Sequence, residues 1–299
     1  MSISFSHQVK NELLKSEDEN RCCMKSRLYG MALFSKNFSF KRITFQSENE
    51  GTTELFKRLL KELCNIDSKI EVSPSGKSFS VDINSKKNAS KLMTFFGHNI
   101  SEKNLVINHS NFDCDACRNA FIAGAFLSCG TISSPEKDYH LEFTAAYLNL
   151  AKSFITLLNE FELSPKLILR KGYNVVYFKD SEAIEDFLYI MGASASMFEM
   201  MNIKIVKEIR NSANRKANCE TANIEKTIQA SMPQIDAILK IKKKKGLDFL
   251  SKPLREMAQA RLDNPELSLA ELAASFEPPI SKSGANHRLK RIEEIAKEL

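Results

Sequence analysis

The sequence predicts an α+β protein in which a duplicated αββαββα domain precedes a separate all-α domain with a helix-turn-helix. Three observations lead to this prediction: an element pattern that repeats after about 95 residues, a basic excess in the last third, and two short C-terminal amphipathic helices flanking a proline turn. The 299 residues exceed one domain of about 150. The expected boundaries are 1–205 for the duplicated domain, 206–222 for a basic linker and 223–299 for the helix-turn-helix domain.

Each repeat begins with a helix that carries a glycine among apolar residues. CMKSRLYGMALFS (23–35) matches CRNAFIAGAFLSC (117–129), which aligns Gly30 with Gly124. Glycine inside a helix costs up to about 1 kcal/mol relative to alanine, so its presence in both copies needs a reason. Tandem repeats usually pack about a pseudo-twofold axis, where small residues let backbones approach closely. We therefore expect these two helices to contact each other at Gly30 and Gly124.

The segments after the first helix match in the same register, which places the repeats at about 20–98 and 114–200. Each repeat continues with a strand, an amphipathic helix, a second strand and a helix followed by glycine, a common helix stop. The matched pairs are RITF (42–45) with HLEF (140–143), LFKRLLKEL (55–63) with SFITLLNEF (153–161), KSFSV (77–81) with VVYFK (175–179), and KLMTFFG (91–97) with DFLYIMG (186–192). Five segments in one register indicate a duplication.

The duplicated unit resembles the LAGLIDADG homing endonuclease fold. IAGAFLSCG (122–130) fits the motif that names the family at its first three residues and its last, and LYGMALFSK (28–36) is a weaker copy. In the endonucleases the last acidic residue of each motif binds a divalent metal. Ser35 and Cys129 occupy these degenerate metal positions here, and Mg²⁺-type cations prefer oxygen ligands. The resemblance thus implies a LAGLIDADG-like fold without catalytic residues, and a protein that is not an enzyme.

The last third of the chain carries the whole basic excess. Residues 201–299 contain 19 Lys and Arg against 13 Asp and Glu, whereas residues 1–200 contain 24 of each. This asymmetry indicates an anionic partner, most simply nucleic acid. Residues 204–228 are polar with weak apolar periodicity, which predicts a flexible linker leading into helices near 224–242. The KKKK run (242–245) is expected to face solvent, with phosphate contact as the alternative.

The final segment, 268–299, predicts the helix-turn-helix. Ser268 and Glu271 form a capping box that starts the first helix. The prolines of EPPI (277–280) end it, because proline cannot continue a helix. Ser281 is then expected to cap the second helix.

The second helix has the composition of a DNA-recognition helix. Ala285, Leu289 and Ile292 recur with helical spacing and form its inward face. The first turns of such a helix enter the major groove, where Lys, Arg, Asn and Ser read base edges or hold phosphates. The predicted DNA-binding residues are Ser281, Lys282, Ser283, Asn286, His287, Arg288, Lys290 and Arg291, with the four basic ones assigned mostly to phosphates. An ordinary helical hairpin is the alternative.

Together the two halves resemble the WhiA-type regulators of Gram-positive bacteria, a degenerate LAGLIDADG domain followed by a helix-turn-helix domain. The resemblance is carried by CRNAFIAGAFLSCGTIS (117–133), YHLEF (139–143), RNSANRKANCETANIEKT (210–227) and PPISKSGANHRLKRI (278–292). It implies a DNA-binding regulator of sporulation gene transcription or of cell division and chromosome segregation. The partners it implies are double-stranded DNA and other transcription or cell-division proteins.

The cysteines give only a weak metal signal. Cys114 and Cys117 form a single CxxC pair, whereas structural zinc normally takes four ligands. Cys22 and Cys23 hold the equivalent place in the first repeat, so the four thiols would converge if the repeats pack symmetrically. Because buried free cysteines are common, the sequence predicts no bound metal and no cofactor.

Other protein classes lack support in the sequence. There is no HExxH, GxSxG or GxxxxGK[ST] pattern, which argues against metalloprotease, serine hydrolase and nucleotide hydrolase chemistry. No apolar run approaches the ~18 residues of a membrane span. The polar N-terminal stretch lacks the basic segment followed by an apolar one that is typical of a signal peptide. We therefore expect a cytoplasmic, nucleoid-associated protein without a membrane partner. Two alternatives stay open, a ligand- or protein-sensing adaptor and an active homing-type endonuclease.

Overall fold

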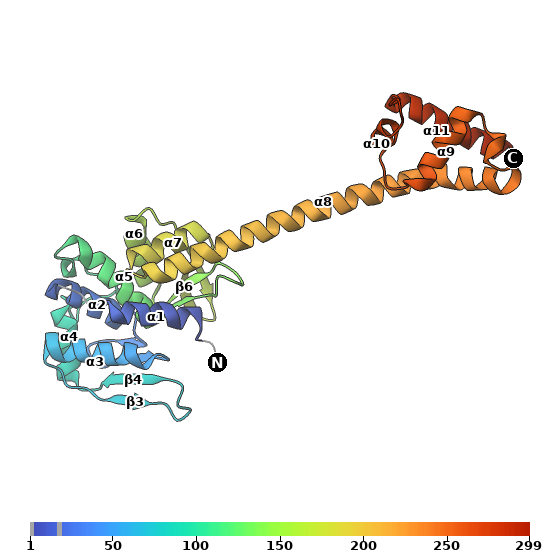
Figure 1. Ribbon diagram of the computed structural model, residues 1–299. Helices are drawn as coiled ribbons and strands as arrows, with labels where there is room; N and C mark the ends of the chain where they lie inside the picture. Colours follow the sequence, from blue (N-terminus) through green and yellow to red (C-terminus); the bar gives the residue numbers. More distant parts are fainter. Residues whose placement is uncertain (1–2, 17–19) are drawn as a thin grey trace. The chain divides into compact units, whose positions relative to one another are not determined.

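The chain divides into two compact units, Met1–Val206 and Lys207–Leu299, each described by itself below. The structure, a computed structural model, describes residues 3–16 and 20–299 (Figure 1). The first unit is α+β and the second is all-α, as the sequence predicts. Among these residues no helix combines the length and the hydropathy needed to cross a bilayer.

The first unit contains two copies of the same αββαββα order, which confirms the predicted fold. In the first copy the elements are α2 (Arg21–Leu33), β1 (Asn37–Phe38), β2 (Ile43–Ser47), α3 (Glu50–Cys64), β3 (Ile70–Val72), β4 (Phe79–Ile83) and α4 (Lys86–Phe95). In the second they are α5 (Asp115–Cys129), β5 (Gly130–Ile132), β6 (Leu141–Ala145), α6 (Leu148–Asn159), β7 (Lys166–Arg170), β8 (Tyr173–Phe178) and α7 (Ser181–Ile190). A short 3₁₀ turn, η1 (His109–Asn111), precedes α5.

Both copies form an antiparallel four-stranded sheet with the same strand order. The orders are β1-β2-β4-β3 and β5-β6-β8-β7. Equivalent aromatic pairs join sheet and helix in each copy: the ring centroids of Phe45 and Phe56 lie 4.4 Å apart, and those of Phe143 and Phe154 lie 5.0 Å apart. The two sheets therefore repeat in their side-chain packing as well as in their topology.

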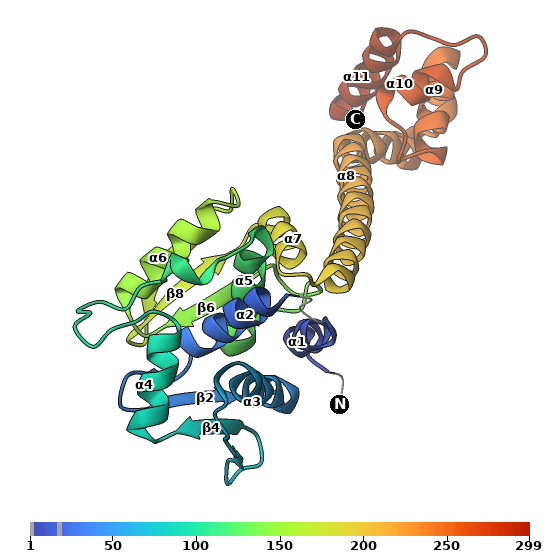
Figure 2. The same cartoon turned by 90° about the vertical axis from the view of Figure 1, so that its left-hand side faces the viewer.

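Helices α2 and α5 lie side by side at the centre of the unit (Figure 2). A Cβ atom added at Gly30 would lie 2.2 Å from the carbonyl oxygen of Phe121, and one added at Gly124 would lie 2.2 Å from that of Arg27. Both distances are far below van der Waals contact, so the two backbones pack directly on each other. The expected glycine contact between the repeat-starting helices is confirmed.

A helix that precedes the repeats, α1 (Phe5–Lys15), contacts both of them, through α3 in the first and α5 and β5 in the second. Its Glu12 carboxylate accepts hydrogen bonds from the backbone N–H of Ala195 at 2.7 Å and of Ser196 at 2.9 Å. These two N–H groups lie at the start of the next helix, α8 (Ser194–Lys245), where backbone donors have no acceptor within the helix itself. Glu12 therefore caps α8. The sequence reasoning did not predict α1.

The expectation of a flexible linker at 206–222 is wrong, because this stretch lies inside the single 52-residue helix α8. Its Ala, Lys, Arg and Glu residues have high helix propensity, and its asparagines cost only a few tenths of a kcal/mol each. Residues 207–222 are exposed or nearly so on every side, so no apolar stripe marks the helix in the sequence. A polar helix without a packing face looks like a linker by periodicity alone.

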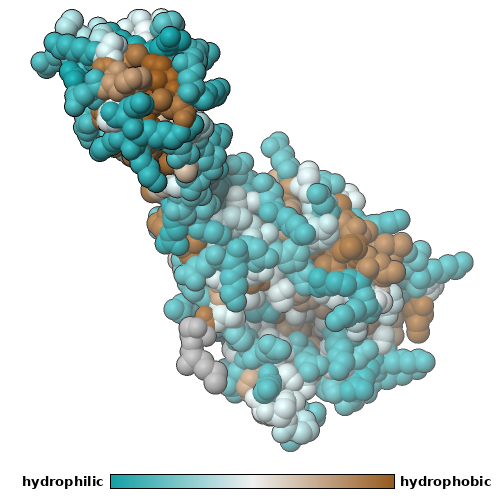
Figure 3. All heavy atoms as spheres, turned by 90° about the vertical axis from the view of Figure 1, so that its right-hand side faces the viewer, coloured by the Kyte–Doolittle hydropathy of each residue, from teal (hydrophilic) through white to brown (hydrophobic). Residues whose placement is uncertain are grey.

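The second unit packs the C-terminal part of α8 against three helices and a 3₁₀ turn. They are η2 (Leu247–Phe249), α9 (Lys252–Asp263), α10 (Leu269–Ala274) and α11 (Lys282–Glu298). Ile238 and Ile241 of α8 enter the core with Leu272, Leu289 and Ile292. Hydrophilic residues surround an apolar patch on the face of this unit in the upper part of Figure 3. The small core is complete without the first unit's residues.

Candidate nucleic-acid interface

The predicted helix-turn-helix is formed by α10 and α11, with starts at the predicted caps. Ser268 and Glu271 make the reciprocal hydrogen bonds of a capping box, at 3.3 Å to the Glu271 N–H and 2.8 Å to the Ser268 N–H. The Ser281 hydroxyl accepts from the Gly284 N–H at 3.1 Å and caps α11. Both helix starts are therefore fixed by short-range hydrogen bonds that the sequence encodes.

Helix α11 buries one side and exposes the other. Ala285, Leu289 and Ile292 are buried, as predicted. At 100° per residue, the side opposite them carries Ser283, His287, Lys290, Arg291 and Glu294. All five are exposed. This outward side offers hydroxyl and imidazole groups in the first two turns and cationic groups in the third.

The remaining predicted residues lie at the helix start or on its flanks. Ser281 and Lys282 are exposed, whereas Asn286 and Arg288 are half-buried on opposite flanks. Arg291 differs from the expectation in having a protein partner, because its guanidinium donates to Glu294 at 2.8 Å. That contact raises the pKa of Arg291, and the pair is solvent-exposed and therefore weak.

A buried arginine that the sequence reasoning missed holds the turn before α10. Arg261 of α9 is 2% exposed, and its guanidinium donates to the carbonyl oxygens of Leu267 at 2.7 Å and Asn264 at 3.3 Å. Burial lowers its pKa, partly opposed by Glu266. Arg261 thereby fixes the chain that leads into the capping box. Nothing local marks it, since an arginine in an amphipathic helix is ordinarily exposed.

Replacing Arg261 with methionine is expected to destabilise the C-terminal unit by about 1–3 kcal/mol, because two half-buried carbonyls lose a charged donor. Arg255→Met in the same helix is the matched control, since the guanidinium of Arg255 pairs with the exposed Asp248, a weak surface interaction. Thermal unfolding followed by circular dichroism measures both. Equal melting temperatures for the two variants would contradict the role given to Arg261.

Lysines at the end of α8 contact the C-terminus of α11. Lys240 Nζ donates to the carbonyl oxygen of Ala296 at 2.7 Å, and Lys244 donates to that of Leu299. These carbonyls have no partner within the helix, and cations are favourable at a helix C-terminus. Lys242, Lys243 and Lys245 are exposed, which fits the expectation for the rest of the run.

The degenerate metal positions at the ends of α2 and α5 contain no carboxylate. The Ser35 hydroxyl donates to the carbonyl oxygen of Asn37 at 2.9 Å. Burial raises the pKa of the Cys129 thiol to about 12, against the opposing effects of the Thr144 backbone and Lys10. Cys129 is thus a neutral thiol at neutral pH and offers no anionic oxygen to a divalent cation.

Lys10 of α1 reaches the same place as Cys129. The two residues line one pocket, and the Lys10 ammonium lies 5.8 Å from the centroid of the Phe126 ring. Burial lowers the pKa of Lys10, while Cys129 and Glu48 favour its charged form. The Lys10 amine therefore lies beside one of the two positions at which the endonucleases hold metal.

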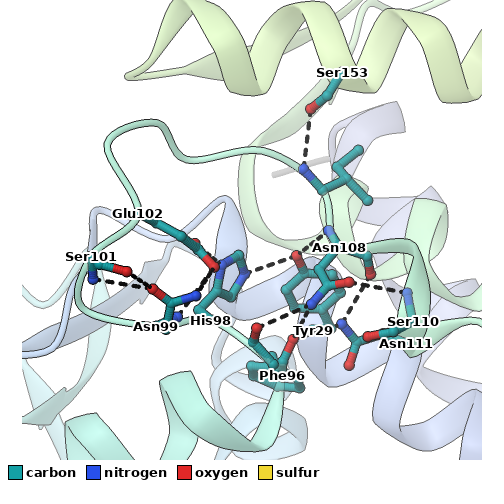
Figure 4. A network of polar contacts seen from close by, with 12 residues as sticks. Tyr29, Phe96, His98, Asn99, Ser101, Glu102, Asn108, Ser110, Asn111 and Ser153 are labelled. Atoms are coloured by element: carbon teal, nitrogen blue, oxygen red, sulfur yellow. Dashed lines mark hydrogen bonds and ion pairs between the residues drawn. The ribbon is translucent and has the colours of Figure 1, made fainter.

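A polar network ties the segment between the repeats to the first one (Figure 4). The Tyr29 hydroxyl accepts from the Asn108 N–H at 2.8 Å and lies 3.0 Å from His98 Nε2, whose Nδ1 lies 2.7 Å from Glu102. The Asn111 amide donates to the carbonyl oxygen of Phe96 at 3.0 Å. Burial raises the pKa of Tyr29, which keeps the phenol neutral. These bonds fix the chain directly before α5.

Two family models match the chain, one for each structural unit. The model described as the WhiA LAGLIDADG-like domain matches residues 118–210, and the one described as the WhiA C-terminal HTH domain matches residues 213–296. A Clostridium botulinum protein named "Probable cell division protein WhiA" is 39% identical over a 314-residue alignment that covers 99% of each chain. The chain belongs to the WhiA family. A Clostridium tetani relative of the same name is 39% identical, with 99% of this chain and 98% of that protein covered.

Solved WhiA structures share the fold. Full-length DUF199/WhiA from Thermatoga maritima matches with a TM-score of 0.61 and 25% identity over 100% of this chain and 99% of that one. An N-terminal LAGLIDADG domain of DUF199/WhiA matches with a TM-score of 0.51 and 20% identity over 64% of this chain and 94% of that one. The WhiA resemblance inferred from the sequence is therefore confirmed, including its LAGLIDADG-like and helix-turn-helix halves.

Proposed function

We propose that this WhiA-family protein is a non-catalytic, sequence-specific regulator that binds double-stranded DNA through α11. The observation that carries the proposal is the exposed side of this helix, where Ser283, His287, Lys290 and Arg291 lie over a buried face that holds the helix in place. From Ser281 to Arg291 the helix contains four basic residues and no acidic one. A positive helix of this kind suits the negative potential and the hydrogen-bonding edges of the major groove.

The cellular role that we propose is control of cell division and chromosome segregation, or of sporulation gene transcription. The relatives' name, "Probable cell division protein", supports the first of these. The sporulation and segregation roles rest on the WhiA resemblance alone. In this proposal the protein works on the nucleoid and binds other transcription or cell-division proteins as well as DNA.

Genomic selection tests the proposal directly. Purified full-length protein is incubated with sheared genomic DNA of the source organism at about 0.15 M salt, near physiological ionic strength, and bound fragments are sequenced. The proposal expects enrichment of a common short motif. Truncation before residue 223 removes α9 to α11 and should abolish the enrichment. Retained enrichment would favour the adaptor alternative, with DNA read by the first unit.

The protein is expected not to cleave DNA in the presence of Mg²⁺ or Mn²⁺. Ser35 and the neutral Cys129 thiol stand where the endonucleases hold carboxylates, and the Lys10 amine lies in the same pocket as Cys129. Supercoiled plasmid and the selected fragments serve as substrates, and gels report nicking. Nicking that follows the protein through purification and stops with EDTA would show an active nuclease.

A further inference from the structure

Four cysteines from both repeats converge on one point in the first unit. Cys22 and Cys23 come from the first turn of α2, Cys114 directly precedes α5, and Cys117 lies in its first turn. The Sγ atom of Cys114 lies 3.6 Å from that of Cys22, 3.5 Å from that of Cys23 and 3.5 Å from that of Cys117. All four sulfur atoms lie within 4.8 Å of one another. We call these four residues the thiol cluster.

These distances fit one tetrahedral metal ion. Zinc–sulfur bonds of about 2.3 Å place the sulfurs of a tetrahedral Cys₄ site about 3.8 Å apart. The three sulfur–sulfur distances from Cys114 lie within a few tenths of an ångström of this value, and all four cysteines are free thiols. Cys114 and Cys117 have the two-residue spacing of zinc ligands, whereas the adjacent Cys22 and Cys23 reach the same point from one helical turn.

The surroundings also suit a structural metal. Cys117 is fully buried and Cys23 is 5% exposed, while Cys22 and Cys114 are half-buried and leave a route for an ion. Phe112 and Ala120 form an apolar shell around the thiols. Thiolates near a helix N-terminus are stabilised by its partial positive charge, and the thiol cluster lies at two such termini.

The chain around the thiol cluster is held in place by hydrogen bonds. The Ser26 hydroxyl lies 2.7 Å from the carbonyl oxygen of Asn111 and 3.0 Å from that of Cys22. The Asn111 amide in turn bonds the carbonyls of Phe96 and Asn108. These bonds fix the segment that presents Cys114 relative to α2. The convergence thus rests on buried contacts between the repeats.

We propose that the thiol cluster binds one Zn²⁺ ion that joins the two repeats. Four thiolates are soft ligands, which select zinc over Mg²⁺ or Ca²⁺, and the thiol protons are released to solvent on binding. Gly124 lies seven residues beyond Cys117, about 10 Å along α5. The ion would therefore fix the N-terminal ends of α2 and α5, while the glycine contact fixes their middles. This site departs from the sequence-based expectation of no metal.

Metal content is the first test. The full-length protein is purified under reducing conditions without added metal or chelator and analysed by inductively coupled plasma mass spectrometry. We expect about one zinc per chain in the wild type. The double variant Cys22→Ser/Cys114→Ser should lose roughly nine-tenths of it. Cys219→Ser is the matched control, because Cys219 is exposed on α8, far along the chain from the cluster, and this variant should keep its zinc.

Cobalt binding and thermal unfolding keep the test independent of how well the variants fold. Co²⁺ added to metal-free wild type should give the intense visible bands of a tetrahedral thiolate site. Removing zinc from the wild type should lower its melting temperature by several degrees, since a ligand of the folded state stabilises it. The folded double variant, checked by circular dichroism, should show neither effect.

Several results would overturn the proposal. Folded wild type that contains no zinc and takes up no cobalt would do so, and so would zinc retained by the double variant. A disulfide among the thiol cluster in freshly isolated protein, detected by non-reducing alkylation and mass spectrometry, would identify a redox pair instead. Iron with acid-labile sulfide would identify an iron–sulfur cluster.

Discussion

Replacing Gly124 with alanine is expected to destabilise the first unit by about 3 kcal/mol, at the upper end of the range for overpacked cores. The added methyl group would lie 2.2 Å from the carbonyl oxygen and 3.0 Å from the carbonyl carbon of Arg27, which are backbone atoms that no rotamer change can move. Helices α2 and α5 would have to separate. Gly124→Leu should have a larger effect, because it adds three more carbon atoms at the same contact.

Differential scanning calorimetry of the full chain measures this loss, which corresponds to roughly 6–12 °C for a unit of this size. Gly51→Ala is the matched control. Its methyl group meets only side-chain atoms, the end of the flexible Leu14 side chain at 2.9 Å and the Oδ1 atom of Asn49 at 3.3 Å, and not backbone as at Gly124. Alanine is also the better helix former, so a much smaller change is expected. A Gly124→Ala protein that melts with the wild type would disprove the close backbone contact.

Replacing Asn286 with alanine is expected to reduce the discrimination between cognate and random DNA by about 1–3 kcal/mol, the value of one good base contact. Asn286 lies half-buried on the flank of α11 within its first two turns, where base contacts concentrate. Competition binding with the selected motif and a scrambled duplex measures the ratio of the affinities for the two. Circular dichroism checks that the variant is folded.

Lys290→Ala is the matched comparison, because a phosphate contact carries no sequence information. It should weaken binding to both duplexes about equally and make the salt dependence shallower by about one unit. Lys290 is preferred to Arg291 for this test, because the Arg291 guanidinium is already paired with Glu294 and its replacement would also remove that ion pair. If both variants bind the selected motif like the wild type, the DNA-reading surface lies elsewhere, and the basic stretch 204–245 is the next candidate.

The parts of the fold that were predicted are those encoded over short distances. The capping box at Ser268 and the cap at Ser281 each depend on residues a few positions apart, and each matched segment of the repeats has its own local pattern, so these features are visible in the sequence. The contact between Gly30 and Gly124 was also predicted, because symmetry supplied the long-range information that one sequence otherwise lacks.

The missed features depend on residues far apart in the chain. Helix α8 begins where its first N–H groups donate to the Glu12 carboxylate and ends in a core with α11, and its polar middle has no apolar period to mark it. Arg261 has a role only because the turn before α10 folds over it. The thiol cluster was recognised as two pairs, but only the packed repeats show how closely the four sulfur atoms converge.

The Lys10 side chain bears on any attempt to build a metal site at the end of α5. A Cys129→Asp variant would place a carboxylate beside the Lys10 amine in the pocket that the two residues share, and the charged form of the amine would pair with that carboxylate. The pair would occupy the oxygen ligands that a divalent cation needs. Building a metal ligand at this position would therefore require a change at Lys10 as well.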